Sequence, residues 1–248
     1  MKILVCISHV PDTTSKINFK ENNTVFDNNG IQYVINPNDE FGLTRAIWFK
    51  EKQGATVDVI NVGGQETDPT LRKALAIGAD SAIRINTYPK DAFSVAAEIS
   101  KIAIDRNYDL IIAGRESIDY NGGMVPGMIA ANIGAGFINN CISIEINNSD
   151  VNAIRETDGG KETLSTNLPL VIGSQKGLVE ESDLKIPNMR GIMMARKKPF
   201  TILDPINSSH YTSCSSFEKP ASKSAVKMID SERIDDLISL LHTEAKVL

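Results

Sequence analysis

The chain has 248 residues, of which 42% are hydrophobic and 23% are charged, a composition typical of a folded globular protein. Its 26 basic and 31 acidic residues give a formal net charge of -5, so it lacks the positive field that binds nucleic acid, and we expect no nucleic-acid partner. The cysteines, Cys6, Cys141 and Cys214, form no CxxC pair, which argues against a zinc site or a disulfide framework and favours a reducing compartment.

The N-terminus, "MKILVCISHVPD", is apolar for only about six residues before a turn, whereas the apolar part of a signal peptide needs roughly 7–15 residues. No later stretch approaches the roughly 20 apolar residues of a membrane span. We therefore expect a cytoplasmic protein with no direct membrane insertion.

The first half of the chain alternates short apolar runs with segments of helical spacing. Buried strands are predicted at 2–8, 56–62, 81–86 and 109–114. Helices are predicted at 38–54, 68–79 and 91–107, with Asn38, Asp68 and Asp91 as N-caps and Gly54 and Gly78 as C-terminal stops. Such alternation makes right-handed crossovers, so we predict an α/β fold with an open, mostly parallel, Rossmann-like sheet covered by helices on both faces.

After Gly136 the pattern changes. Apolar and polar residues alternate at 141–146, 151–157 and 161–168, with a glycine-containing turn at 157–160, which predicts an antiparallel excursion before a buried strand at 169–174. A basic cluster follows at 196–198, then a long polar stretch and an amphipathic helix near 231–245. Because long polar stretches are uncommon inside compact domains, we predict an α/β nucleotide-binding domain at 1–200 and a C-terminal arm at 201–248 that packs on a partner.

Ligands of open parallel sheets bind beyond the carboxyl ends of the strands, in the loops before helices. Five segments occupy such positions in the predicted sheet: 8–14, 36–39, 62–66, 86–91 and 115–124. In the last of them, Gly122 and Gly123 permit close backbone approach, and the first turn of the next helix offers free N–H groups to an anion. The alternative is that residues 121–123 only cap that helix, with Pro126 in its first turn.

The inventory for bond-making chemistry is poor. His9, His210 and His242 are scattered along the chain, and no GxSxG or HExxH motif occurs. We therefore assign no catalytic residue and no metal ligand, and expect a nucleotide-binding protein rather than an enzyme.

Residues 153–172, "AIRETDGGKETLSTNLPLVI", resemble the signature of the electron transfer flavoprotein β-subunit, the small subunit of that family. The matching residues are Ala153, Arg155, Asp158, Gly159, Glu162, Leu164, Pro169, Val171 and Ile172. Gly173 departs from the signature, which usually has Thr, Ala, Cys or Ser there. Segments such as "INPNDEFGLTRAIWFKE" and "IPNMRGIMMARKKP" extend the resemblance over residues 1 to 200.

The resemblance implies a heterodimer with an α-subunit that holds most of a redox-active FAD, while the β-subunit binds AMP. Electrons would arrive from acyl-CoA and related dehydrogenases, as in fatty acid oxidation, and leave to a membrane quinone oxidoreductase or another acceptor. The β-chain itself would act as an electron carrier subunit and catalyse no bond-making step.

Carried over by position, the AMP contacts fall on two single residues, the turn at 36–39 and the loop and helix start at 119–130. They are Cys6, Asn36, Pro37, Asn38, Asp39, Val62, Asp119, Tyr120, Asn121, Gly122, Gly123, Met124, Val125, Pro126, Gly127, Met128, Ile129 and Ala130. The resemblance implies that backbone amides of 121–125 hold the phosphate and that Cys6, Asn36 and Val62 line the adenosine pocket. Most of these positions coincide with the strand-end segments chosen above.

Two further positions, Met124 and Thr13, depart from the family, and a third, Leu178, is assigned by counting back from Pro187 and Asn188. Met124 replaces the usual glutamine of the loop, so a side-chain contact to phosphate is missing. Thr13 stands where some members place a tyrosine near the flavin. Leu178 is the expected exposed leucine that docks dehydrogenases, as a small binding hot spot, with a partly buried loop leucine as the alternative.

Two further hypotheses stay open. In the bifurcating branch of the family, a second FAD occupies the AMP position. An adenine-nucleotide hydrolase-like enzyme would share the sheet, but it needs a Ser-Gly-Gly loop after the first strand, and residues 8–14, "SHVPDTT", do not supply one.

Overall fold

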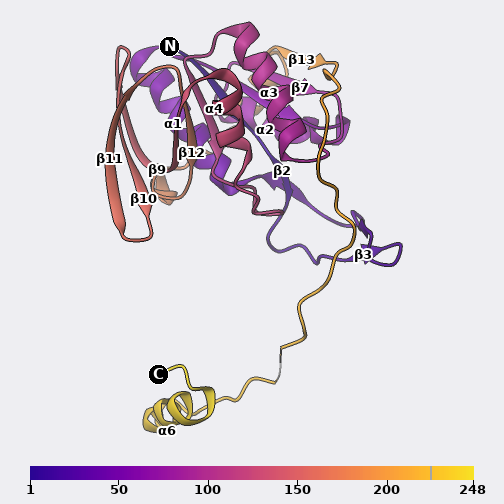
Figure 1. Ribbon diagram of the computed structural model, residues 1–248, viewed down its shortest axis with the longest axis vertical. Helices are drawn as coiled ribbons and strands as arrows, with labels where there is room; N and C mark the ends of the chain where they lie inside the picture. The colour runs from indigo at the N-terminus through magenta and orange to yellow at the C-terminus, as the bar shows by residue number, and fades with distance from the viewer. Residues whose placement is uncertain (224) are drawn as a thin grey trace.

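Across residues 1–223 and 225–248, which the computed structural model describes, the centre of the fold is a nine-stranded sheet (Figure 1). The strand order is β11-β10-β9-β12-β8-β1-β6-β7-β13, and every pairing from β9 to β13 is parallel. The four strands predicted in the first half are confirmed as β1 (Lys2–Cys6), β6 (Thr56–Val62), β7 (Ser81–Ile85) and β8 (Leu110–Gly114). The predicted open, mostly parallel α/β fold is therefore correct.

Helices cover both faces of the sheet. Residues of α1 (Pro37–Gln53) and α2 (Asp68–Ile77) pack in the apolar cluster on one face, and residues of α3 (Ala92–Arg106) and α4 (Val125–Ile133) pack in the cluster on the other. Two predicted N-caps are wrong: Asn36, not Asn38, caps α1, and Thr67, not Asp68, precedes α2. In each helix a proline lies in the first turn, where its fixed φ suits the helix and its missing N–H costs nothing.

The predicted antiparallel excursion is confirmed as β9 (Gly136–Asn147), β10 (Asp150–Thr157) and β11 (Gly160–Asn167). The chain then returns to the sheet interior as β12 (Leu170–Ser174), between β9 and β8. At Gly173 a Cβ would collide with the amide of Asn139 on β9, which gives a steric reason for glycine at the position that departs from the family signature.

The sheet has one switch point, where consecutive crossovers leave in opposite directions. The chain leaves β1 through α1 toward β6 on one side, whereas it leaves the adjacent β8 through α4 toward β9 on the other. In open α/β sheets, ligands bind at the carboxyl ends of the two strands that flank such a point. The relevant residues here are those that follow β1 and β8.

Beyond β12, the chain forms a short helical turn at Glu181–Asp183, then α5 (Met189–Ala195) and β13 (Phe200–Leu203), an edge strand that the sequence did not predict. Outside the main sheet, four short strands form two antiparallel pairs, β2 (His9–Pro11) with β5 (Tyr33–Ile35) and β3 (Phe19–Lys20) with β4 (Val25–Phe26), and a 3-10 turn at Gln65–Thr67 precedes α2. The predicted C-terminal helix is present as α6 (Ile234–Leu240), continued by a π-helical turn at Leu241–Ala245.

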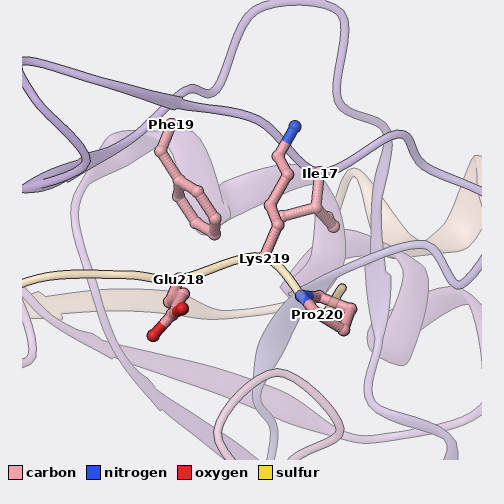
Figure 2. Close-up of a pocket in the computed structure, with 5 residues that line it drawn as sticks. All are labelled: Ile17, Phe19, Glu218, Lys219 and Pro220. Carbon is pink, nitrogen blue, oxygen red and sulfur yellow. The ribbon is translucent and has the colours of Figure 1, made fainter. Parts of the chain in front are cut away.

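Around Phe217, the C-terminal arm packs against the β3–β4 hairpin. Its Phe217 ring stacks on Phe19 of the β3–β4 hairpin with centroids 4.7 Å apart, and the Phe217 N–H donates to the Asn23 carbonyl at 2.7 Å. Ile17 and Phe19 line a pocket of about 400 Å³ with residues 218–220 of the arm (Figure 2). Beyond it the arm extends away from the sheet and ends in α6 (Figure 1). The division into a domain at 1–200 and an arm at 201–248 remains a prediction.

Candidate functional site

The turn that begins α1 connects the ends of β1 and β8. Asp39 is 1% exposed, and its two carboxylate oxygens accept the N–H groups of Ser8, just after β1, and Gly114, the last residue of β8, each at 2.7 Å. Burial raises the pKa of Asp39 to about 7, although hydrogen bonds from Ser8, Asn36 and Gly114 lower it. This carboxylate bridges the switch point.

The same turn holds the loop that follows β8, residues 115–124. The amide N–H groups of Asn36 and Asn38 each donate to the Glu116 carbonyl at 3.0 Å, and the Asn36 side-chain oxygen accepts the N–H of Ile118 at 3.2 Å. Asn36 is fully buried and both ends of its amide are used within the protein. The structure thus brings together two segments, 36–39 and 115–124, that the sequence placed separately at strand ends.

An apolar floor lies beside them on the α3–α4 face of the sheet. Cys6 of β1, Val62 of β6, and Ile129 and Ala130 of α4 are buried in one cluster. Val125 and Met128 are partly buried against it. Burial, and then the charge of Asp39, raise the pKa of the Cys6 thiol, so this thiol stays neutral and contributes as an apolar surface.

The glycine loop is exposed and does not cap the helix with a side chain. Residues 119–124 are exposed, Gly123 has a left-handed φ of 61°, and the N-cap of α4 is Met124, which makes no capping hydrogen bond. The alternative in which residues 121–123 serve as the cap is therefore wrong. The first-turn N–H groups of Val125 and Gly127 have no intrahelical acceptor and can donate hydrogen bonds to an anion, whereas Pro126 has no N–H.

A buried arginine braces the glycine pair that follows β6, Gly63 and Gly64, a role that the sequence did not reveal. Arg84 of β7 donates to the Gly63 carbonyl at 3.1 Å and to Asn86 at 2.7 Å, and its Nε lies 2.7 Å from the Asp68 carboxylate. A lone arginine in an otherwise apolar strand carries no signal that it pairs with Gly63 and Asp68, because these residues belong to the loop after β6 and the start of α2. This brace fixes the residues that follow Val62.

Aromatic side chains flank the loop region. His9 stacks on Tyr33 with ring centroids 4.2 Å apart, and its Nδ1 lies 2.8 Å from the Thr70 hydroxyl. Burial lowers the pKa of His9, although Glu66 and Asp119 raise it, so the ring is neutral near pH 7. Thr13, in the segment 8–14, and Tyr120, in the loop 115–124, are exposed and are available to a partner surface.

Leu178 does not have the exposure expected of a docking residue. It is 4% exposed and packs in the core on the α1–α2 face, because the chain after β12 turns back at Gly177, whose φ is 99°, against Ile142. The expectation of an exposed leucine is wrong. The Pro-Asn turn is instead flanked by two exposed apolar side chains, Ile186 at 82% exposure and Met189 at 76%.

Within residues 1–223 and 225–248, no group of three or more His, Cys, Asp or Glu side chains is placed to hold a metal ion. None of the helices in the described part of the chain has both the length and the apolar character to cross a membrane.

Comparison with known proteins decides the family. The model of the electron transfer flavoprotein domain matches residues 23–207. The chain belongs to the electron transfer flavoprotein family. It is similar to the electron transfer flavoprotein subunit beta of Bacillus subtilis strain 168, 33% identical over 100% of both chains. It is likewise similar to that of Syntrophomonas wolfei, 32% identical over 94% of this chain and 91% of the relative, and of Bradyrhizobium diazoefficiens, 30% identical over 100% of both.

Membership of the β-subunit family implies electron transfer, association with flavin and nucleotide, and an electron transfer flavoprotein α-subunit as partner. The family signature noted in the sequence falls on β10, β11 and β12. It therefore marks the antiparallel excursion and a central strand rather than the switch-point residues.

Proposed function

We propose that the chain is the β-subunit of a heterodimeric electron transfer flavoprotein that binds AMP at the switch point and helps to hold FAD at the interface with its α-subunit. The single observation that carries the AMP assignment is the convergence at one place of the 36–39 turn, the exposed glycine loop and the uncapped first turn of α4. The subunit acts in electron transfer and catalyses no bond-making reaction itself.

The residues at the switch point suit an adenosine monophosphate. Backbone N–H groups around Gly123 and the first turn of α4 would hold the phosphate, because the positive end of the helix dipole attracts an anion. Cys6 and Val62 supply an apolar surface for adenosine on the α3–α4 face. Met124, 49% exposed, offers no hydrogen bond in place of the usual glutamine, so the phosphate would be held mainly by backbone groups.

FAD would lie between the subunits, where its isoalloxazine ring accepts and releases electrons. Thr13 lies in the exposed loop between β2 and β3, and the neighbouring Asp12 carboxylate fixes this loop by accepting the N–H and hydroxyl of Thr14. Thr13 would therefore present a hydroxyl, rather than a tyrosine ring, to the α-subunit side.

The arm is the segment that we assign to contact with the α-subunit. Beyond its anchor at Phe217, it leads to α6, on which Ile234, Leu237 and Ile238 are exposed. A helix with an exposed apolar face needs a partner surface to bury it. Acyl-CoA dehydrogenases would dock elsewhere, through Ile186 beside the Pro-Asn turn, and a membrane quinone oxidoreductase would accept the electrons.

A count of bound cofactors tests the proposal. The chain is co-expressed with its α-subunit, and nucleotides are released by denaturation and separated by chromatography. One FAD and one AMP per heterodimer are expected. Two FAD and no AMP would instead assign the chain to the bifurcating branch, and hydrolysis of an added adenine nucleotide would favour the hydrolase-like enzyme.

A further inference from the structure

We propose that Asp39 is a positioning residue for the nucleotide site: its carboxylate fixes the carboxyl ends of β1 and β8 relative to each other and does not contact the nucleotide. This inference rests on the proposed function, and it changes the role that the family resemblance implies for Asp39. Both carboxylate oxygens are already used, by the N–H groups of Ser8 and Gly114 at 2.7 Å, and the side chain is almost fully buried. At 1% exposure the carboxylate is out of reach of a bound nucleotide.

The packing around Asp39 leaves no room for another arrangement. A Cβ on Gly114 would collide with the Asp39 carboxylate and would lie 2.8 Å from the Asn36 amide nitrogen. Glycine at 114 thus lets the carboxylate reach the end of β8. Because Asn36 and Asn38 hold Glu116 and Ile118 from the same turn, displacement of Asp39 would also shift the start of the 115–124 loop.

The same two strands are tied by a second carboxylate at their other ends. Asp109, just before β8, accepts the N–H of Lys2, the first residue of β1, at 2.7 Å. Asp109 therefore resembles Asp39 in chemistry and in the strands it joins, but it lies at the amino edge of the sheet, away from the switch point. It provides a matched control for the loss of a carboxylate that holds β1 against β8.

Protonation of Asp39 should weaken the arrangement. A neutral carboxyl loses one charge-assisted acceptor, and burial places the pKa of Asp39 at about 7. The charged and titratable groups near it are the Cys6 thiol of β1, whose pKa is raised by burial, Glu40 of α1, which is paired with Lys73, and Glu116, which is paired with Arg115. Nucleotide affinity should therefore fall as the pH drops through this range.

The test measures AMP binding by calorimetry to nucleotide-stripped heterodimers of full-length chain and α-subunit. Asp39→Asn should bind AMP about tenfold more weakly at about pH 8, because a hydrogen bond to a charged acceptor is lost. Gly114→Ala, which displaces the carboxylate without removing it, should have the same effect. Asp109→Asn should lower thermal stability but keep AMP affinity within about twofold.

The pH profile separates positioning from a merely structural role. Between about pH 8 and about pH 6 the ratio of wild-type to Asp39→Asn affinity should shrink, since only the wild type has a carboxyl to protonate; the phosphate of AMP titrates equally in both. Wild-type AMP affinity in folded Asp39→Asn and Gly114→Ala heterodimers would overturn the inference and leave the AMP site in place. Failure of the wild type to bind AMP would overturn the proposed function and this inference with it.

Discussion

Gly123 and Met124 are neighbours in the glycine loop, but they should differ in their effect on AMP binding. Gly123 has a φ of 61°, which costs a side-chain-bearing residue about 1–2 kcal/mol, so Gly123→Ala should shift the backbone and weaken AMP binding about tenfold. Met124→Ala removes only an exposed aliphatic chain and should change the affinity by less than about twofold. Calorimetric titration with AMP would measure both.

Gly134 gives the control for backbone strain at the other end of α4. Its φ is 67° and open space surrounds it, so Gly134→Ala should cost similar stability without touching the loop. Equal loss of AMP affinity in Gly134→Ala and Gly123→Ala would show that the effect is general destabilisation of α4.

Individual side chains are where prediction from sequence was least successful. The strand-end rule located the 36–39 turn and the 115–124 loop, because strand ends can be identified from apolar runs and their flanking turns. It did not show that the Asn36 amide is consumed by Glu116 and Ile118, or that Arg84 braces Gly63, because those partners come together only in the folded chain. The predicted exposure of Leu178 was wrong for the same reason, since local sequence does not reveal which face of a loop is buried.

At the scale of elements, Asp91 joins α3 to the C-terminal arm. One carboxylate oxygen accepts the Ser94 N–H in a capping box, and the other accepts the N–H groups of Tyr211 and Thr212 at 2.7 and 3.2 Å. The Tyr211 ring also packs edge-to-face on Phe93 at 4.7 Å. Burial raises the pKa of Asp91, but these backbone hydrogen bonds together hold it well below the ordinary value.

A lowered pKa fixes the sign of the pH dependence. The stabilisation from Asp91 should be complete above the ordinary carboxyl pKa of about 3.9 and should be lost as the pH falls toward the lower folded-state value. Near pH 7, Asp91→Ala should free residues 211–212 of the arm and cost about 1 kcal/mol as a lost helix cap. Hydrogen exchange of the Tyr211 and Thr212 amides would detect the release, and unchanged exchange would contradict it.

Elements with a strong local pattern were predictable and those made by distant pairing were not. Residues 91–107 combine a capping aspartate with helical spacing, and α3 matches them closely. β13 has only four residues, Phe200 to Leu203, and exists because it pairs in parallel with β7, far away in the sequence. The β3–β4 hairpin is shorter still and is covered by Phe217 of the arm.

At the scale of the whole molecule, substitutions of Ile186 and Leu178 should affect different properties, docking to a dehydrogenase for Ile186 and stability of the fold for Leu178. Both are aliphatic and lie in the segment between β12 and α5, but Ile186 is exposed and Leu178 is in the core. Ile186→Ala should slow electron transfer from an acyl-CoA dehydrogenase about tenfold, as loss of an interface hot spot, with FAD content and thermal stability unchanged. Leu178→Ala should instead lower the free energy of unfolding by about 2–5 kcal/mol through the cavity it leaves.

Stopped-flow reduction of the heterodimer by the dehydrogenase, alongside thermal unfolding of each variant, would measure both effects. The measurement has to be made well below the melting temperature of the Leu178→Ala variant, so that slow transfer in that variant is not a result of unfolding. Because Ile186 is exposed for docking and Leu178 is packed in the core, Ile186→Ala should change only the transfer rate and Leu178→Ala only the stability. Normal transfer by Ile186→Ala would place the dehydrogenase contact elsewhere on the surface, and slow transfer by a folded Leu178→Ala would return the docking role to the leucine.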